Sequence, residues 1–339
     1  MKFDPVLLAP RMAPMKAAGL WRDETIDVHV QRALRNCPDK LAVVAYAAER
    51  TEPVRLTYRE LDAQVDLVAR GLVSLGVGRQ DTVTFQLPNC CEFLVLCLAC
   101  ARIGAVANPV MPIFRQHELT FMLNFGESKV FIVPKIFRGF DYEAMARGMR
   151  RDLPHLTRLI VIGGDGEDGF ESLLLSDATP ALSGPGIGPD DVLLLMYTSG
   201  TTGEPKGVMH TSNTLFSNLH AYRDTMELGP DDIILGASPM AHLTGYGYLA
   251  MLPLILNSTT VLQDVWEPRR ALQIVRDENV SFSMASSPFV ADLCGAVEAG
   301  DRTTARFNKF CCAGAPIPPV LIERAQKVLG MRLCSAWGM

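Results

Sequence analysis

The sequence has no strong excess of charge, because 32 Lys and Arg face 37 Asp and Glu, for a formal net charge of −5. Long basic runs are also absent, so we expect no nucleic-acid partner. The longest apolar stretch, residues 93–107, is broken by Arg102 and is too short to span a bilayer. Residues 6–9 are too few for the core of a signal peptide. We therefore predict a cytoplasmic protein without a membrane span.

Paired cysteine motifs are nearly absent as well. The chain has nine cysteines, an odd number, and Cys97 and Cys100 form a Cys-x-x-Cys pair. A redox or zinc site is one interpretation of this spacing, but neither a second pair nor a nearby histidine accompanies it. Because the pair lies in an apolar run with a helical pattern, we predict buried free thiols.

What the sequence does contain is a repeated alternation of strand and helix patterns. At 339 residues the chain can bury a large core. Residues up to about 35 are expected to be irregular, since they contain Pro5, Pro10 and Pro14. The predicted strands are 41–47, 54–57, 82–87, 106–110, 129–133, 158–162, 192–196, 232–237, 260–262, 281–285, 307–311 and 331–335. The predicted helices are 58–75, 90–103, 116–125, 141–151, 214–226, 249–256, 268–278, 287–299 and 318–329.

This alternation predicts βαβ units and a largely parallel sheet, which is an α/β fold. Residues 163–189 interrupt the alternation and are rich in Gly, Asp, Ser and Pro, as in a linker. We therefore predict two packed α/β sub-regions, 27–162 and 190–339, joined by the loop 163–189. Ligands of such sheets bind at the carboxyl ends of the strands.

A polar segment follows the apolar run 192–196. Residues 198–207 combine four hydroxyl side chains, three glycines and Lys206. Glycines let successive backbone N–H groups converge on an anion, and a lysine ammonium is a point charge suited to phosphate. The spacing is not that of a Walker A loop, because Lys206 stands between Pro205 and Gly207. The segment predicts a polyphosphate-binding loop, with a polar surface loop as the alternative.

Residues 197–208 resemble the phosphate-loop signature of the adenylate-forming superfamily, which includes acyl-CoA synthetases, adenylation domains of peptide synthetases and firefly luciferase. The resemblance implies that ATP and Mg²⁺ bind here, with Lys206 as a catalytic residue and Thr201, or else Thr202, near the metal. The ATP-binding residues that it implies are Thr198, Ser199, Gly200, Thr201, Thr202, Gly203 and Lys206.

Three further segments follow predicted strands, namely 238–245, 312–316 and 335–339. A lone histidine such as His242 is often structural, and the glycine and the tryptophan of the other two segments could serve a tight turn and a strand end. The resemblance implies that His242 is catalytic and that the three segments line the adenine and the acyl group. The pocket residues that it implies are His242, Gly245, Gly314, Ala315, Pro316, Trp337 and Gly338.

The resemblance covers residues 27–339 and departs from the family at the end of the chain. The chain stops one residue before the threonine and glutamate that the family motif leads one to expect. We therefore expect an incomplete N-terminal domain without the small C-terminal domain and its catalytic lysine, and with impaired activity.

The resemblance implies that a carboxylic acid and ATP form an acyl-adenylate and pyrophosphate, after which coenzyme A displaces AMP. Residues 237–262 contain no Asp or Glu to pair with an ammonium group, so we predict an apolar medium-chain, alicyclic or aryl acid. Three alternatives remain: a ligase that loads an acyl carrier protein, a nucleotide-binding module without turnover, and a phosphate-loop hydrolase. Whether the chain forms a homodimer is left open.

Overall fold

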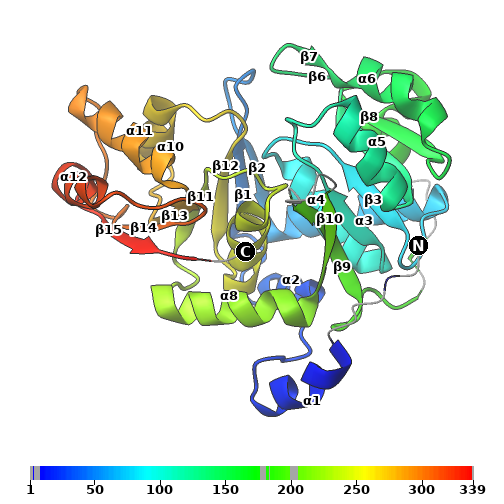
Figure 1. Cartoon of the computed structure of the whole chain (residues 1–339), viewed down its shortest axis with the longest axis horizontal. Helices are drawn as coiled ribbons and strands as arrows, with labels where there is room; N and C mark the ends of the chain where they lie inside the picture. The colour runs from blue at the N-terminus through cyan, green and yellow to red at the C-terminus, as the bar shows by residue number, and fades with distance from the viewer. Residues whose placement is uncertain (1–2, 4–7, 176–180, 183, 199–204, 338–339) are drawn as a thin grey trace. The chain divides into compact units, whose positions relative to one another are not determined.

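The computed structural model describes residues 3, 8–175, 181–182, 184–198 and 205–337. The chain divides into two compact units, each assembled from separate segments of the sequence. The first unit comprises residues 1–31, 60–87 and 92–222, and the second comprises residues 32–59, 88–91 and 223–339. Each unit contains one large sheet, and Figure 1 labels most of the strands.

The first unit is built on a six-stranded sheet with the order β10-β9-β4-β3-β5-β8. Its strands are β3 (Thr82–Phe85), β4 (Val106–Pro109), β5 (Ser128–Pro134), β8 (Arg158–Ile162), β9 (Val192–Thr198) and β10 (Lys206–Thr211). All neighbouring strands pair in parallel except β10, which is antiparallel to β9. The central strands are mostly apolar, as expected for strands buried on both faces, and Thr84 and Asn108 are buried polar exceptions.

Helices cover this sheet and bury its apolar side chains. The longer helices that lie wholly or mainly in this unit are α1 (Leu8–Ala17), α3 (Tyr58–Ser74), α4 (Cys91–Ile103), α5 (Gln116–Phe125), α6 (Tyr142–Met149) and α8 (Ser212–Met226). Shorter elements are β6 (Ile136–Phe137), β7 (Phe140–Asp141), η1 (Arg150–Asp152), η2 (Gly166–Asp168) and α7 (Phe170–Leu174). Leu119 of α5 and Met149 of α6 pack with Phe131 of β5 in one buried cluster. Asp141 caps the N-terminus of helix α6, because its carboxylate accepts the N–H of Ala144.

The cysteine pair of α4 lies in the interior. Cys97 and Cys100 are both buried free thiols. Burial raises the pKa of Cys97 well above its usual value and raises the pKa of Cys100 to about 12. The prediction of buried free thiols is therefore confirmed.

The second unit is built on a seven-stranded sheet with the order β15-β14-β13-β11-β12-β1-β2. Its strands are β1 (Leu41–Tyr46), β2 (Val54–Thr57), β11 (Ile233–Gly236), β12 (Thr259–Gln263), β13 (Phe282–Ala285), β14 (Lys309–Cys312) and β15 (Arg332–Ser335). Strand β2 forms an antiparallel hairpin with β1, and the other pairs are parallel.

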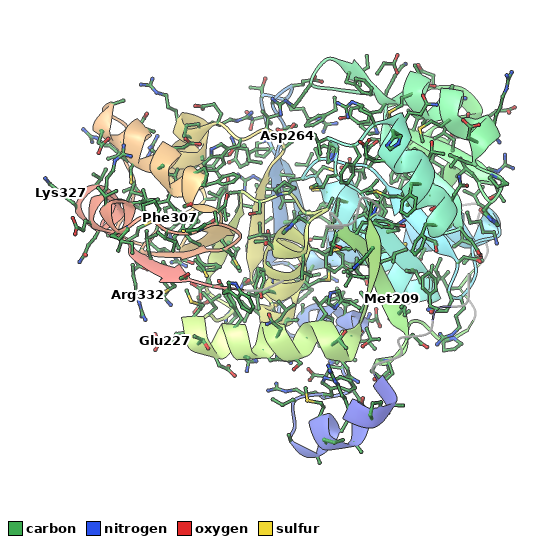
Figure 2. The ribbon with its side chains drawn as sticks, viewed as in Figure 1. Met209, Glu227, Asp264, Phe307, Lys327 and Arg332 are labelled. Atoms are coloured by element: carbon green, nitrogen blue, oxygen red, sulfur yellow. The ribbon has the colours of Figure 1, made fainter. Side chains whose placement is uncertain are left out.

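A π-helix and several α-helices accompany this second sheet. They are η3 (Thr244–Met251), α9 (Leu252–Leu256), α10 (Pro268–Asp277), α11 (Ser287–Glu298) and α12 (Pro319–Leu329). Phe307, labelled in Figure 2, is fully buried in the cluster that joins these helices to the sheet. Its ring meets that of Phe310 edge to face, with the centroids 6.3 Å apart. Aromatic pairs of this kind stabilise a core beyond their buried area.

The α/β fold with largely parallel sheets is confirmed, and most predicted elements lie within two residues of their expected bounds. The expectation of an irregular segment up to residue 35 is wrong. Helices α1 and α2 (Ile26–Asn36) occupy most of it. In α2 the side chains of Ile26, Val30 and Ala33 recur at helical spacing and are all buried, so the helix gains an apolar face despite the nearby prolines.

Residues 163–189 do not separate the two sheets as expected. Strands β9 and β10 follow this segment, yet they complete the sheet of the first unit. Strands β1 and β2 precede it, yet they belong to the sheet of the second unit. Parallel neighbours need a crossover connection, so strands that are adjacent in a sheet need not be adjacent in the sequence.

The described helices were also compared with the requirements of a bilayer. None of them combines the length and the apolar character that a membrane-crossing helix needs.

Candidate active site

In the second unit, the three segments predicted from the sequence follow strands of one parallel sheet. Residues 238–245 follow β11, residues 313–316 follow β14, and residues 336–337 follow β15. Because these strands run in parallel, their carboxyl ends lie at one edge of the sheet. The structure therefore brings the three segments to the edge where a ligand of an α/β sheet is expected.

The first residue of each of the last two segments extends the hydrogen bonding of the sheet, and the chain then turns away from it. The N–H of Ala313 donates to the carbonyl of Ala285 at 3.1 Å, and the N–H of Ala336 donates to that of Cys312 at 2.8 Å. Gly314 then adopts a φ of +80°, a conformation that favours glycine. The side chain of Trp337 is 88% exposed.

The other pocket residues of these segments are placed as follows. Ala315 and Pro316 are exposed beside Gly314. Gly338 lies outside the described residues.

The turn that carries His242 is fixed by a buried amide that sequence reasoning missed. The Nδ2 of Asn89 donates to the carbonyls of Gly236 and Ser238, at 3.3 and 3.0 Å. Its Oδ1 accepts the N–H of Met240 at 2.8 Å. One side chain thereby satisfies three backbone groups of the turn. The sequence gives little sign of this role, because an Asn between a strand and a helix is equally typical of a local turn.

His242 presents a neutral imidazole with one nitrogen already engaged. Its Nδ1 accepts the backbone N–H of Thr244 at 3.2 Å. An acceptor nitrogen carries no proton, so this bond assigns the proton of the neutral ring to Nε2. His242 is exposed at one side, yet partial burial of its ring lowers the pKa, which favours the same neutral form. The imidazole can therefore offer an Nε2–H donor to a carboxylate or phosphate oxygen.

The residues after His242 are helical from Thr244 onward, five residues before the start of the predicted helix 249–256. They form the π-helix η3, which is entered through a bond from the N–H of Tyr246 to the carbonyl of His242 at 2.8 Å. Gly245 is buried in its first turn. A Cβ on Gly245 would lie 2.1 Å from the carbonyl oxygen of Pro239 and 2.6 Å from the Cα of Met240. Glycine is therefore required for the helix to approach the His242 turn.

In the first unit, Thr198 and Lys206 frame the predicted phosphate segment. They are register partners at the end of the β9–β10 hairpin where the chain connects the two strands, and both side chains are exposed. Lys206 was expected in a loop, but it begins strand β10 because pairing with β9 extends to it. The predicted residues Ser199, Gly200, Thr201, Thr202 and Gly203 lie outside the described residues.

Aromatic side chains of helix α5 support this hairpin. The hydroxyl of Tyr197 donates to the carbonyl of Met122 at 2.7 Å, and its ring meets Phe125 edge to face. A Cβ on Gly207 would lie 2.8 Å from Phe125, so the strand passes close to this ring. The glycine after Lys206 therefore serves packing.

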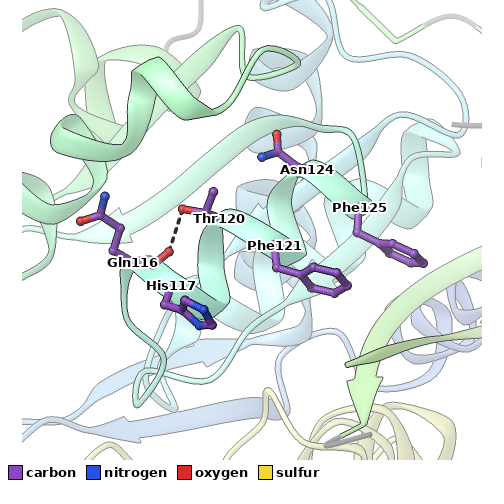
Figure 3. A pocket seen from close by; sticks show the side chains of 6 residues that line it. All are labelled: Gln116, His117, Thr120, Phe121, Asn124 and Phe125. Atoms are coloured by element: carbon purple, nitrogen blue, oxygen red, sulfur yellow. Dashed lines mark hydrogen bonds between the residues drawn. The ribbon is translucent and has the colours of Figure 1, made fainter. Parts of the chain in front are cut away.

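Helix α5 also borders a surface hollow, shown in Figure 3. Its lining residues are Gln116, His117, Thr120, Phe121, Asn124 and Phe125. The rings of Phe121 and Phe125 stack with their centroids 5.6 Å apart. Among the residues that the structure describes, none of those lining the hollow belongs to the predicted site.

Each unit thus carries a different part of the predicted chemistry. The hairpin of the first unit offers the ammonium of Lys206 and the hydroxyl of Thr198, which suit an anion. The sheet edge of the second unit offers a neutral imidazole, an exposed glycine turn and an exposed indole. This second set suits a planar or apolar ligand with one hydrogen-bonding group.

Comparison with known proteins identifies related sequences over most of the chain. A family model described as "AMP-binding enzyme" matches residues 30–339. The medium-chain fatty-acid–CoA ligase of Escherichia coli is 29% identical over 331 residues, which cover 97% of this chain and 57% of that ligase. The salicyl-AMP ligase / salicyl-S-ArCP synthetase of Mycobacterium tuberculosis is 34% identical over 253 residues, which cover 75% of this chain and 44% of that protein.

A solved structure gives the same result for the fold. The apo structure of MbtA from Mycobacterium smegmatis matches with a TM-score of 0.84 and 27% sequence identity. The match covers 100% of this chain and 60% of that one. The chain therefore spans about half of the length of the relatives that it matches.

Proposed function

Because the chain belongs to the family of AMP-binding enzymes, we propose that it is the ATP-binding part of an acid–CoA ligase. In the first reaction, a carboxylate oxygen attacks the α-phosphorus of ATP and pyrophosphate leaves, which yields an acyl-adenylate. In the second, the thiol of coenzyme A attacks the acyl carbon, AMP leaves, and a thioester forms. The observation that carries the proposal is the family match together with the hydroxyl- and glycine-rich segment framed by Thr198 and Lys206.

Lys206 is proposed to bind the β- and γ-phosphates of ATP. Its exposed position on the hairpin leaves the ammonium accessible, and a lysine is a point charge that suits phosphate. The hydroxyls of Thr198 and of the following segment would add neutral donors, and Thr201 or Thr202 would help to hold a metal ion. Mg²⁺, when bound, neutralises phosphate charge. Both reactants are anions, so charge neutralisation and alignment dominate the barrier.

His242 is proposed to orient the reacting carboxylate or acyl group. Its Nε2–H is available as a donor because Nδ1 accepts the N–H of Thr244. The carboxylate is ionised at neutral pH and needs no general base. A neutral imidazole whose pKa is lowered by burial therefore fits a hydrogen-bonding role better than proton abstraction.

An apolar acid is proposed as the substrate. Residues 237–262 carry no carboxylate that could pair with an ammonium group. The π-helix η3 that follows His242 is mostly apolar, and Trp337 adds an exposed ring at the same sheet edge. The names of two relatives include a medium-chain fatty acid and salicylate. We therefore propose a medium-chain, alicyclic or aryl acid.

An acyl carrier protein is a second candidate for the thiol that accepts the acyl group. The relative from Mycobacterium tuberculosis is named as both an AMP ligase and an ArCP synthetase, which supports this alternative. A comparison of coenzyme A with a phosphopantetheinylated carrier as the acceptor would decide between them. Thioester formation with the carrier protein but not with coenzyme A would identify the enzyme as a ligase that loads an acyl carrier protein.

The test is exchange of pyrophosphate into ATP with a panel of medium-chain, alicyclic and aryl acids. We expect exchange only when an acid is present, and Lys206→Met should lower it by roughly 100- to 1000-fold, as for loss of a group that stabilises developing charge. The matched control is Lys327→Met, because Lys327 projects from the outer side of α12 (Figure 2).

Three results would contradict the proposal. An equal loss of pyrophosphate exchange in Lys206→Met and Lys327→Met would argue against phosphate binding by Lys206. Binding of ATP by calorimetry without any exchange would favour a module that binds nucleotide without turnover. Release of phosphate in the absence of an acid would favour a hydrolase.

A further inference from the structure

Three potential metal ligands converge in the first unit, outside the segments that carry the proposed function. Glu24 precedes helix α2, His29 lies on α2, and His220 lies on α8 (Figure 1). The Oε2 of Glu24 is 3.5 Å from the Nε2 of His29 and 3.1 Å from the Nε2 of His220. Among the described residues, these three form the one group of such side chains whose ligand atoms lie within 4.8 Å of one another.

The two distances from Glu24 match two edges of a coordination tetrahedron. Zn²⁺ binds imidazole nitrogen and carboxylate oxygen at about 2.0–2.2 Å, which places neighbouring tetrahedral ligands about 3.3 Å apart. The two measured distances from Glu24 lie on either side of that value. Two imidazoles and one carboxylate are also the donor set of catalytic zinc sites, which leave the fourth position open.

The burial of the group suits a metal with one open position. The side chain of His29 is 1% exposed and that of His220 is 6% exposed, whereas that of Glu24 is 30% exposed. Glu24 is thus the member of the group that solvent reaches most readily. A water molecule could therefore complete the coordination from the side of Glu24.

The surrounding structure holds the ligands in place without a metal. The residue before Glu24, Asp23, accepts the Nδ2–H of Asn213 at 2.8 Å, and its N–H donates to the Oδ1 of Asn213 at 3.0 Å. Asn213 lies on α8, the helix that also carries His220. The ring of Phe216 meets that of His29 edge to face at 5.8 Å. A site with ligands so oriented loses little entropy on binding a metal.

An ion pair also connects the residue before Glu24 to helix α1. The Nζ of Lys16 lies 2.8 Å from Asp23 and 3.1 Å from Asp190, and these two carboxylates raise the pKa of Lys16. Asp190 also accepts the Nδ2–H of Asn213 at 2.7 Å. The position of Glu24 thus depends on contacts that the metal ligands do not make themselves.

We propose that Glu24, His29 and His220 bind one Zn²⁺ ion. The ion would fix the segment between α1 and α2 against α8, and it would differ in place and in donor set from the Mg²⁺ that accompanies ATP. The proposal is independent of the proposed ligase activity, so either can fail without the other.

The experiment measures metal uptake by the untagged full chain after removal of metals with a chelator. We expect about one equivalent of Zn²⁺ by elemental analysis, together with visible absorption of a tetrahedral Co²⁺ adduct without thiolate charge-transfer bands. Glu24→Gln keeps the size of a partly exposed side chain and should weaken Zn²⁺ binding about 100-fold or more, since even the loss of an outer partner costs about 10- to 100-fold. His220→Gln should do the same.

The matched control is His155→Gln, which removes an exposed histidine elsewhere in the first unit and should leave Zn²⁺ affinity unchanged. Uptake of far less than one equivalent by the wild type would overturn the proposal. So would equal affinity in the wild type and Glu24→Gln, or thiolate bands in the Co²⁺ spectrum that assign the metal to cysteines. Glu24→Gln provides a test even if a buried-histidine variant does not fold.

Discussion

Replacing Gly245 by alanine tests the close approach of the π-helix η3 to the His242 turn. The added Cβ would meet three backbone atoms of Pro239 and Met240, at 2.1, 2.4 and 2.6 Å. Nonbonded heavy atoms normally lie about 3.5 Å apart, so the turn would have to move by about 1 Å. Because the obstacles are backbone atoms, rotation of a side chain cannot relieve the overlap.

The expected loss of stability has two parts. Overpacking of a buried site costs about 1–3 kcal/mol. The movement would also stretch the bonds from Asn89 to the carbonyl of Ser238 and from the N–H of Met240, each worth about 1 kcal/mol. We therefore expect Gly245→Ala to lower the free energy of unfolding by about 2–5 kcal/mol, a large part of the ~5–15 kcal/mol typical of a folded domain.

Urea unfolding measures the loss, and hydrogen exchange of peptides from residues 239–256 locates it. The matched control is Gly295→Ala in α11, where the nearest atom to the added Cβ is the end of Arg324 at 3.8 Å. Because alanine is the better helix former, this control should gain up to about 1 kcal/mol. Equal unfolding midpoints for Gly245→Ala and the wild type would refute the predicted overlap.

The remaining predictions concern the same turn. Asn89→Ala leaves backbone groups of Gly236, Ser238 and Met240 unpaired and should cost about 2–4 kcal/mol in urea unfolding; a loss below 1 kcal/mol would argue against the clamp. Burial lowers the pKa of His242 below its usual 6.5, so the unfolded chain takes up the proton first as the pH falls. Stability is therefore kept above about pH 6.5 and reduced below it, and His242→Gln should lessen the loss between about pH 7 and pH 5. The same pH dependence in the variant would assign the loss to other groups.

The sequence predicted best those elements that display their own periodicity. Helix α3 begins at Tyr58, as expected, because Leu61, Val65 and Val68 repeat at helical spacing and are buried. The hairpin of β1 and β2 was also correct, since its strands are neighbours in the chain. In both cases the decisive contacts are local.

Elements defined by distant partners were harder to predict. Strand β10 was not predicted, because its first residues, Lys206 and Gly207, are not typical of a strand. The strand forms because it pairs with β9. The polar residue types of the site were readable from the sequence, and so was their position after strands. The roles of Asn89 and Gly245 were not, because each depends on a backbone approach that arises only in the folded unit.

The interleaving of the two units in the sequence has a consequence for synthesis on the ribosome. Val43 of β1 pairs with Thr260 of β12, and Tyr58 bonds to Ser258, 200 residues later. At about 5–20 residues per second, the apolar strand β1 waits roughly 10–40 s for that neighbour. The β2 hairpin protects one edge of β1 during this time and leaves the other open. The nascent chain therefore presents an unpaired, apolar strand edge until β12 has emerged.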